Sequence, residues 1–356
     1  MRIIEVDGVN QAWPEGLALL DRHGERQSSR AGDVIVAPWP VVTVYRQPTE
    51  RVLLEPARDA NPFFHLFEAV WMLAGRDDAT WLDRFVRDFS ARYGEPPHGR
   101  MHGAYGHRWR RNFDVDQLAV VVDRLRRDPT DRRVVMQMWD PVSDLFGPVE
   151  APHVGVEGRL VDEVEWPDEP RDLPCNLCVI PRIVGGALDV TVICRSNDVV
   201  WGAYGANAVH FSVLQEYLAA ALGVQVGTMY QWSNNYHAYT REVERVVKRA
   251  ADGNLWQPLW LGDLGMPRET YPGTLPMVDV PSEFLRDCER WCSAESPADG
   301  VYGNSWFRRV AAPMWHVHEA YRGRGAGADA AVALTDHIEA PDWRLAAQRW
   351  LARRTR

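Results

Sequence analysis

The stretch CNLCVIPRIVGGALDVTVICRSNDVVWG, residues 175–202, decides the fold. It contains two apolar runs, 178–184 and 187–195, on either side of a Gly-Gly pair, and this pattern is a strong signal for a β-hairpin. A hairpin brings its outer ends together, so Arg195 is expected to reach Cys175. Because a nearby arginine stabilises a thiolate, Cys175 becomes a candidate nucleophile.

Outside this hairpin, apolar periodicity predicts a mixed α/β core that ends near residue 270. The segment 61–75 has helical spacing, with Asn61 as a cap, Pro62 in the first turn and Gly75 as a stop. The other expected elements are one or two strands in 34–46, helices over 114–129 and 208–223, a buried strand over 132–141, and a strand at the start of 226–240.

Two regions depart from this core. Residues 142–173 are acidic and rich in proline and glycine, and we interpret them as a surface insertion. From about residue 281 the pattern becomes helical. We therefore expect a catalytic domain over 1–270 and a helical C-terminal extension over 271–356 that packs on it.

Composition narrows the class of protein. The chain has 356 residues, 46% of them hydrophobic, and a formal net charge of −9. This charge argues against general nucleic-acid binding but permits a local cationic site for one phosphate. No stretch is long and apolar enough to predict a membrane span, and the N-terminus lacks a signal core. Five cysteines then favour reduced thiols and a cytoplasmic protein.

Cys175 has other interpretations. A buried structural cysteine is the more common case for an isolated free thiol. Cys175 and Cys178 also form a C-x-x-C pair, but a thioredoxin-like pair opens a helix, whereas this one enters a strand. A zinc site would need two further ligands, which Cys288 and Cys292 could supply only from a helix. We expect no metal.

Several polar residues are candidates for binding. Arginine matches phosphate geometry, although a solvated surface arginine is the alternative for each one. Glu68 lies on an apolar helix and is either solvent-facing or a proton shuttle. His237 and Tyr239 share one face of an extended segment and could hold a sugar, or His237 could be a satisfied core residue. The phosphate candidates are Arg26, Arg132, Arg133, Arg195 and Ser196.

Taken in order, these segments resemble the thymidylate synthase family, including its pyrimidine hydroxymethylase branch. The matching strings between residues 61 and 240 are FHLFEAVWMLAG, YGHRWR, DRRVVMQMWDP, LPCN, CRSNDVVWG and NNYHAY. The resemblance implies a mixed β-sheet flanked by helices. It also implies an obligate homodimer with shared active sites, with a pyrimidine nucleoside monophosphate and 5,10-methylenetetrahydrofolate as substrates.

The resemblance implies a role for each matching residue. Cys175 would add to C6 of the pyrimidine, which activates C5 to attack the folate methylene. Glu68 would organise water and protons, Tyr105 would assist C5 proton transfer, and Asp198 would contact the pterin. The nucleotide contacts would be Arg26, Arg195 and Ser196 on the phosphate, Arg132 and Arg133 on the phosphate of the neighbouring subunit, His237 and Tyr239 on the sugar, and Asn207 on the base.

The chain departs from the synthases at the positions that control the product. Synthases have a tryptophan before the YG-x-x-WR block, and it keeps water from the intermediate. Here the segment RFVRDFSARYG offers Phe89 and Ser90 instead, which we interpret as a folate and water gate. Asn176 replaces a usual histidine, the chain ends in an arginine-rich helix, and the segment before Asn207 is one residue longer than usual.

These departures favour hydroxymethylation over methylation. For the base we favour a cytidylate, CMP or dCMP, because a flipped Asn207 amide could read cytosine unless its neighbours fix its orientation. The alternatives are thymidylate synthase, dUMP hydroxymethylase, and an inactive homologue that binds nucleotides or RNA.

Overall fold

A mixed β-sheet carries the fold of this computed structural model, which describes residues 1–145, 170–252, 270–323 and 327–354. The strand order is β1-β4-β8-β7-β6-β5, and the β2–β3 hairpin joins through β3 to β8. The strands are β1 (Arg2–Val6), β2 (Glu25–Ser29), β3 (Gly32–Val36), β4 (Val41–Tyr45), β5 (Met136–Gln137), β6 (Asn176–Val184), β7 (Ala187–Asp198) and β8 (Gln225–Tyr239).

The predicted hairpin is confirmed as β6 and β7, which pair antiparallel from Asn176 opposite Cys194 to Val184 opposite Ala187. Gly185 and Gly186 have φ angles of 57° and 81°, the left-handed conformation that a two-residue hairpin turn of this type requires. The segment 34–46 forms two strands, β3 and β4, as expected.

The predicted strand over 132–141 was too long, because only Met136 and Gln137 are in strand conformation. The amide of Gln117 accepts from the Gln137 N–H at 2.7 Å and donates to the Gln137 carbonyl at 2.8 Å. The Gln117 side chain thus occupies the N–H and the carbonyl of Gln137 that a further neighbouring strand would have used, so the sheet ends at β5.

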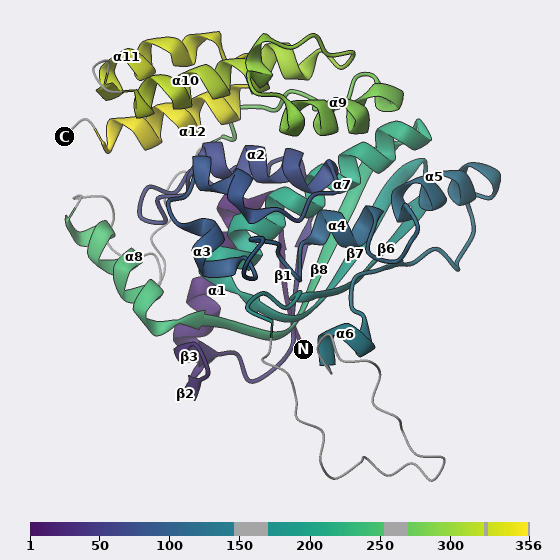
Figure 1. Ribbon diagram of the computed structural model, residues 1–356. Coiled ribbons are helices and arrows are strands. Elements are labelled where there is room, and N and C mark those ends of the chain that lie inside the picture. Colours follow the sequence, from purple (N-terminus) through teal and green to yellow (C-terminus); the bar gives the residue numbers. More distant parts are fainter. Residues whose placement is uncertain (146–169, 253–269, 324–326, 355–356) are drawn as a thin grey trace.

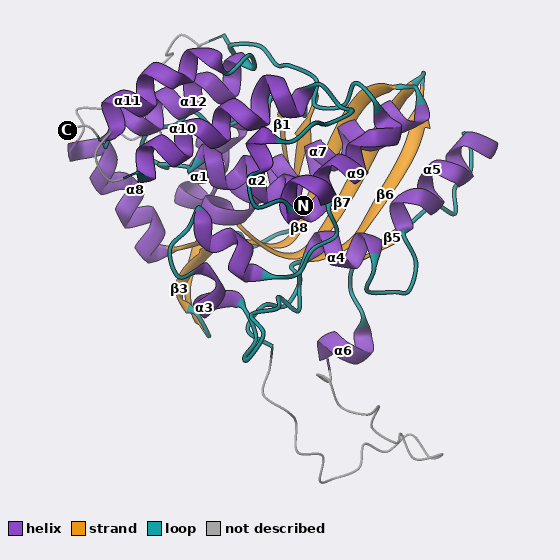
Figure 2. Ribbon diagram, turned by 45° about the horizontal axis from the view of Figure 1, so that its top comes forward, coloured by secondary structure: helices purple, strands orange, loops and turns teal. Residues whose placement is uncertain are grey.

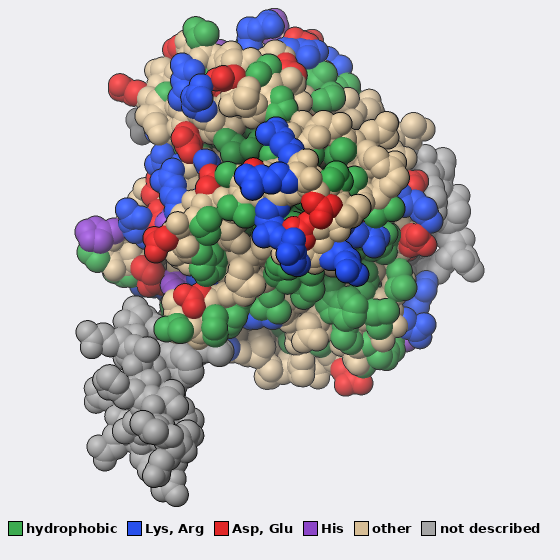
Figure 3. All heavy atoms as spheres, turned by 90° about the vertical axis from the view of Figure 1, so that its right-hand side faces the viewer, with side chains coloured by type: hydrophobic (Ala, Val, Ile, Leu, Met, Phe, Trp, Pro, Cys, Tyr) green, Lys and Arg blue, Asp and Glu red, His purple; other side chains and the backbone are tan. Residues whose placement is uncertain are grey.

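Among the described residues, helices cover one face of the sheet and leave the other face open. Along β7, Leu188, Val190 and Val192 are fully buried, whereas alternate residues are half-exposed. The open face is apolar and includes Cys178, Ile180, Thr191, Ile193, Tyr230 and Trp232. On the side where β6 and β7 lie, hydrophobic side chains gather below a band of arginines (Figure 3).

Helix α2 (Pro62–Leu73) begins as predicted, with the Asn61 side chain accepting from the N–H groups of Phe63 and Phe64. The other helices before residue 253 are α1 (Val9–His23), α3 (Phe89–Tyr93), α4 (Tyr105–Arg110), α5 (Gln117–Arg127), α6 (Pro141–Leu145), α7 (Asn207–Leu222) and α8 (Thr240–Asp252). Helices α5 and α7 correspond to the predicted helices over 114–129 and 208–223.

A helical layer formed by the C-terminal residues lies over α2 and α7, on the side away from the sheet (Figures 1 and 2). Its helices are α9 (Pro281–Ser293), α10 (Ala312–Arg322), α11 (Gly327–Leu334) and α12 (Pro341–Ala352). The division near residue 270 and most of the insertion at 142–173 fall on residues outside the described part, so both stay predictions. None of the helices in the described ranges is long and apolar enough to cross a membrane.

Candidate active site

Three segments bring the predicted polar residues to one edge of the sheet. Strands β7 and β8 are parallel, so their carboxyl ends meet, and Asp198 pairs in register with His237. Strand β6 is antiparallel to β7, so its beginning lies at the same edge. Because Cys175 immediately precedes β6, the fold places it beside the end of β7, where Arg195 lies.

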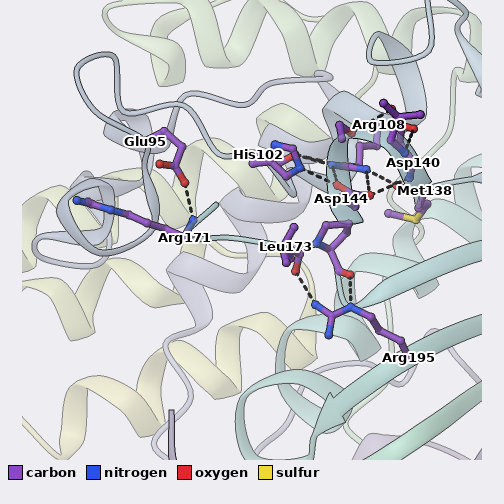
Figure 4. A network of polar contacts seen from close by, with 12 residues as sticks. Glu95, His102, Arg108, Met138, Asp140, Asp144, Arg171, Leu173 and Arg195 are labelled. Carbon is purple, nitrogen blue, oxygen red and sulfur yellow. Dashed lines mark hydrogen bonds and ion pairs between the residues drawn. The ribbon is translucent and has the colours of Figure 1, made fainter. Parts of the chain in front are cut away.

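The segment Arg171–Cys175, here called the nucleophile loop, is held from both sides (Figure 4). Arg195 donates from Nε to the Pro174 carbonyl at 3.0 Å and from Nη2 to the Leu173 carbonyl at 3.3 Å. The Arg195 N–H also donates to the Cys175 carbonyl at 2.9 Å. These contacts fix the position of the backbone that carries the Cys175 thiol.

The far end of the nucleophile loop is held by helix α3 and the turn that follows it. The Arg171 N–H donates to Glu95 Oε1 at 2.6 Å, and its guanidinium donates to the carbonyls of Ala91 and Gly94 at 3.1 and 3.3 Å. The loop is therefore fastened to the sheet by Arg195 and to α3 by Arg171.

The Cys175 thiol corrects our expectation that Arg195 would dominate its ionisation. Burial raises the pKa of Cys175 above its ordinary value, and the positive charge of Arg195 lowers it by less. The carboxylates of Asp172 and Asp198 raise it further. The net shift is upward because the effect of burial, together with the two nearby negative charges, outweighs the positive charge of Arg195.

The alkylation rate of Cys175 should therefore follow the thiolate fraction of a weakly acidic thiol. We expect reaction with iodoacetamide to rise about tenfold per pH unit between about pH 6 and 8, without a plateau. Fragmentation of the peptide that contains both residues distinguishes modification of Cys175 from that of Cys178, and Cys175→Ala confirms the assignment. A plateau near neutral pH would show that Arg195 outweighs burial after all.

Glu68 is mostly buried and paired, with 12% of its side chain exposed. Its Oε2 lies 2.9 Å from Nε2 of His210 on α7, while Nδ1 of His210 is enclosed without a partner in the described part of the chain. The ring of Tyr105 packs on His210 and Phe211. The negative charge of Cys175 contributes, after burial, to raising the pKa of Tyr105. These contacts place Glu68 and Tyr105 on the nucleophile's side of α2.

Asp198 ends β7 and caps the turn that follows. Its Oδ2 accepts from the Trp201 N–H at 2.7 Å, while Oδ1 is enclosed without a partner among the described residues. Burial raises the pKa of Asp198, against the effect of nearby His237. Tyr239 packs edge-on against His237, and its pKa is raised by burial and by the charge of Asp198.

Asn207 lies at the start of α7 and is fixed by a second amide. Its Nδ2 donates to Asn197 Oδ1 at 3.1 Å, and Asn197 Nδ2 donates to Ser233 Oγ at 3.0 Å. A Cβ on Gly202 would lie 2.8 Å from Asn197 Oδ1, so only glycine leaves room for this pair. The turn before Asn207, Val199–Ala206, is a π-helix, which accommodates the additional residue in that segment.

The predicted phosphate ligands are not all brought together in one protomer. Ser196 lies on β7 beside Arg195, whereas Arg26 is exposed on β2. Arg132 and Arg133 are exposed on the loop between α5 and β5. Arg133 forms an ion pair with Asp131, with Nε 2.9 Å from Oδ1.

The β2–β3 turn also carries an arginine that the sequence analysis missed. The positive charge of Arg30 lowers the pKa of Tyr239, partly opposing burial. Arg30 is therefore closer to the sugar-side residues than its position in the sequence indicated.

The two residues predicted as a folate and water gate have structural partners. Phe89 is buried and packs on Phe64 and Tyr93 with ring-centre distances of 5.5 and 4.8 Å. The hydroxyl of Ser90 donates to Asp83 at 2.5 Å. Tyr93, one helical turn after Phe89, is the aromatic residue whose pKa responds to Asp172 and Glu68. The gate at Phe89 and Ser90 stays a prediction, with Tyr93 as an additional candidate.

The arginine-rich C-terminal segment is held against the catalytic part of the chain through Asp59. Arg353 and Arg354 both bind Asp59, at 2.9 and 3.0 Å, and hold its pKa below the ordinary value despite burial. The neighbouring Arg58 stacks over Trp201, 4.3 Å from its ring centre, and lies near Asp198. The chain end thus supports a loop that reaches the active site.

A half-buried cysteine, the carboxylates of Asp172 and Asp198, and the nearby Glu68 and Tyr105 form an arrangement that can support covalent and proton-transfer chemistry. Among the described residues, no group of three or more histidines, cysteines or carboxylates could hold a metal ion. The thymidylate synthase family model matches residues 23–254, so the chain belongs to this family. It is therefore a one-carbon transferase that uses a folate and a pyrimidine nucleotide.

The curated relatives add detail to this assignment. A deoxyuridylate hydroxymethyltransferase of Pseudomonas phage M6 is 41% identical, over 99% of this chain and 95% of the relative. The enzyme of the same name from Bacillus phage SP01 is 32% identical over 64% of this chain and 56% of the relative. A putative thymidylate synthase of Methanosarcina acetivorans is 28% identical over 69% of this chain and 95% of the relative.

Sequence reasoning missed the polar residues that support the predicted ones. Asp172 was assigned to a surface insertion, although its position just before Leu173-Pro174-Cys175 could have marked it. Asn197 lies inside the RSND string and could have been considered with Asn207. His210 and Glu68 are 142 residues apart, so no spacing signal could have paired them.

Proposed function

We propose that the protein 5-hydroxymethylates dUMP with 5,10-methylenetetrahydrofolate and water. The Cys175 thiolate adds to C6, and C5 attacks the one-carbon unit. The C5 proton is lost through the Tyr105 and Glu68 side of the site, and tetrahydrofolate leaves. Water then adds to the resulting exocyclic methylene, and expulsion of the thiolate releases the product. The similarity to the phage M6 enzyme over nearly the whole chain is the observation that most supports this proposal.

The fixed amide of Asn207 supports uracil as the base. With Nδ2 directed to Asn197, Asn207 keeps its Oδ1 for the N3–H of uracil and a second N–H for O4. Cytosine presents the opposite pattern, an acceptor at N3 and a donor at C4. Reading it would need a flipped Asn207, whose Oδ1 would face Asn197 Oδ1 unless the flip extended to Ser233.

The direction of the Asn207 amide leads us to replace the preference for a cytidylate, because that preference rested on the freedom of Asn207 to flip. The names of the two phage relatives support the same choice, because both refer to deoxyuridylate.

The folate side of the site supports water as the final nucleophile. Trp81, the only tryptophan between residues 76 and 100, is buried and packs on Phe85, with ring centres 5.5 Å apart. Asp172, whose charge acts on both Cys175 and Tyr93, and Tyr93 itself are polar. A polar lining admits water, whereas a stacked indole would exclude it.

The purified enzyme should convert dUMP to 5-hydroxymethyl-dUMP and release tetrahydrofolate, and it should act poorly on dCMP and CMP. Mass spectrometry of the nucleotide together with spectroscopy of the folate distinguishes the products. Formation of thymidylate with dihydrofolate would identify a thymidylate synthase and contradict the proposal. Efficient turnover of dCMP would contradict only the choice of base.

Two substitutions at Asn197 test the base-reading argument. Asn197→Asp keeps an acceptor toward Asn207 and should retain the preference for dUMP. Asn197→Ala frees the Asn207 amide, so the ratio of kcat/KM for dCMP to that for dUMP should rise by about tenfold, the equivalent of one hydrogen bond. Thermal melts show whether both variants are folded, and equal ratios would remove Asn197 from base selection.

We also propose that two copies pack through the open sheet face, with Arg132 and Arg133 reaching the partner's phosphate site. The half-exposed apolar residues of β6, β7 and β8 provide a self-complementary surface for such a dimer. The exposed ion pair of Arg133 with Asp131 is cheap to rearrange.

A further inference from the structure

Asp172 occupies a constrained position in the nucleophile loop, three residues before Cys175. Arg171 fastens the backbone before Asp172 to α3. Arg195 of β7 holds the backbone after Asp172 by donating to the carbonyls of Leu173 and Pro174 (Figure 4). Gly103 packs closely against this point, because a Cβ there would lie 3.0 Å from Asp172 Oδ2. The carboxyl group is therefore held in one place relative to the thiol.

The Asp172 side chain has an unused oxygen. Its Oδ2 is enclosed and has no hydrogen-bond partner within the described ranges. Burial raises the pKa of Asp172 to about 6, although the Gly103 N–H and the charges of His102 and Arg108 lower it. The negative charge of Glu68 adds to the upward shift. An enclosed carboxylate oxygen without a partner is costly, and it is free to accept a hydrogen bond or a proton from a ligand or from water.

The electrostatic neighbours of Asp172 are residues of the active site. Its charge raises the pKa values of Cys175, Tyr105 and Tyr93, each after the larger effect of burial. Asp172 therefore lies among the nucleophile, the residue proposed for C5 proton transfer and the aromatic residue of α3.

We propose that Asp172 is the general base that activates the water ending the reaction, an inference that rests on the proposed hydroxymethylation. Its carboxylate removes a proton from water as the oxygen bonds to the exocyclic methylene on C5. The electron pair of that double bond moves to C4–O4 as an enolate. Collapse of the enolate restores the C4 carbonyl, forms C5=C6 and breaks the C6–S bond, which releases the Cys175 thiolate. No oxidant or reductant is needed.

Glu68 is less suited to this step because its carboxylate is engaged by His210 at 2.9 Å. Asp198 shares with Asp172 a backbone N–H donor and an enclosed oxygen without a partner in the described part of the chain, so a variant at Asp198 serves as a control below. A base with the pKa of Asp172 is mostly ionised at neutral pH yet able to hold a proton.

Asp172→Asn should separate the steps before water addition from the step that uses water. With dUMP tritiated at C5, the variant should release tritium in a burst stoichiometric with active sites, whereas formation of 5-hydroxymethyl-dUMP falls by about 10²- to 10⁴-fold. The stalled methylene adduct should be intercepted by added 2-mercaptoethanol as a thioether. Wild-type product formation should decline as the pH falls through about 6, and the variant should lack this acid limb.

Two control variants define the outcomes. Asp123→Asn, the same change on the exposed surface of α5, should alter neither readout. Asp198→Asn, at the proposed pterin contact, should reduce tritium release and product together. If Asp172→Asn forms the hydroxymethyl product at the wild-type rate, or loses burst and product in parallel, Asp172 is not the water base. If the wild-type enzyme makes thymidylate, this proposal and the proposed function are both wrong.

Discussion

Cys175→Ala is expected to abolish release of tritium from 5-tritiated dUMP, with a loss of about 10⁴-fold or more. Without addition at C6, C5 of a pyrimidine has no electron density with which to attack a one-carbon unit. The loss should therefore appear in the earliest chemical step and leave binding intact. Equilibrium binding of dUMP to the variant should stay within a few-fold of wild type, because the thiol supplies little ground-state affinity.

Cys178→Ala provides the matched control. Cys178 lies three residues further on, half-exposed on the open face of β6, and burial also raises its pKa. This variant should keep tritium release and yield the same covalent adduct on denaturation. Substantial release by Cys175→Ala would place the nucleophile elsewhere and leave Cys175 a structural thiol.

The hairpin and helix α2 could be predicted because their signals are local. Gly185-Gly186 determines a turn by itself, and Asn61 caps α2 through groups two and three residues away. Helix α1 escaped prediction because Pro14 and Gly16 weaken its helical signal. In the fold, Gly16 packs against Tyr204 and Tyr236. A Cβ at this position would lie 2.3 Å from the Tyr204 ring and 2.2 Å from the Tyr236 hydroxyl, so glycine allows the close packing here.

The candidate site also contains a part that could be predicted from the sequence and a part that could not. Cys175 and Arg195 follow from the hairpin register, and Asp198 and His237 follow from parallel strands that end together. The acid–base environment depends on contacts with no sequence spacing. The sequence predicted a thiol activated by Arg195, but desolvation of the half-buried Cys175 outweighs that arginine and raises its pKa, with the charge of Asp172 adding to the rise.

The base and the fate of the one-carbon unit depend on neighbours of the predicted residues. Asn207 alone permits either pyrimidine, and only its bond to Asn197 gives the amide a direction. Phe89 and Ser90 alone suggested a gap that water could enter. In the fold, Phe89 and Ser90 instead contact Phe64 and Asp83, whereas the charge of Asp172 acts on both Tyr93 and Cys175.

Mixing Cys175→Ala with Arg133→Ala should restore activity at dUMP concentrations far below the raised KM of the arginine variant, if the active sites are shared. In a heterodimer of Cys175→Ala and Arg133→Ala, one site combines an intact thiol with the intact arginine of the other copy. Random exchange of subunits makes half of the dimers mixed, with one working site each, so activity should reach about a quarter of wild type. The arginine variant alone should show a raised KM for dUMP, because its lesion lies in phosphate binding.

Arg127→Ala is the control for the arginine substitution, because Arg127 is also exposed, on α5, and pairs with Asp123 on the surface. It should be active alone and should not depend on mixing. Absence of recovery under conditions in which tagged wild-type subunits demonstrably exchange would place Arg133 outside the site. Recovery of activity is stronger evidence for a shared site than a dimer detected by size-exclusion chromatography alone. Recovery requires that one copy supplies the nucleophile and the other copy supplies the arginine.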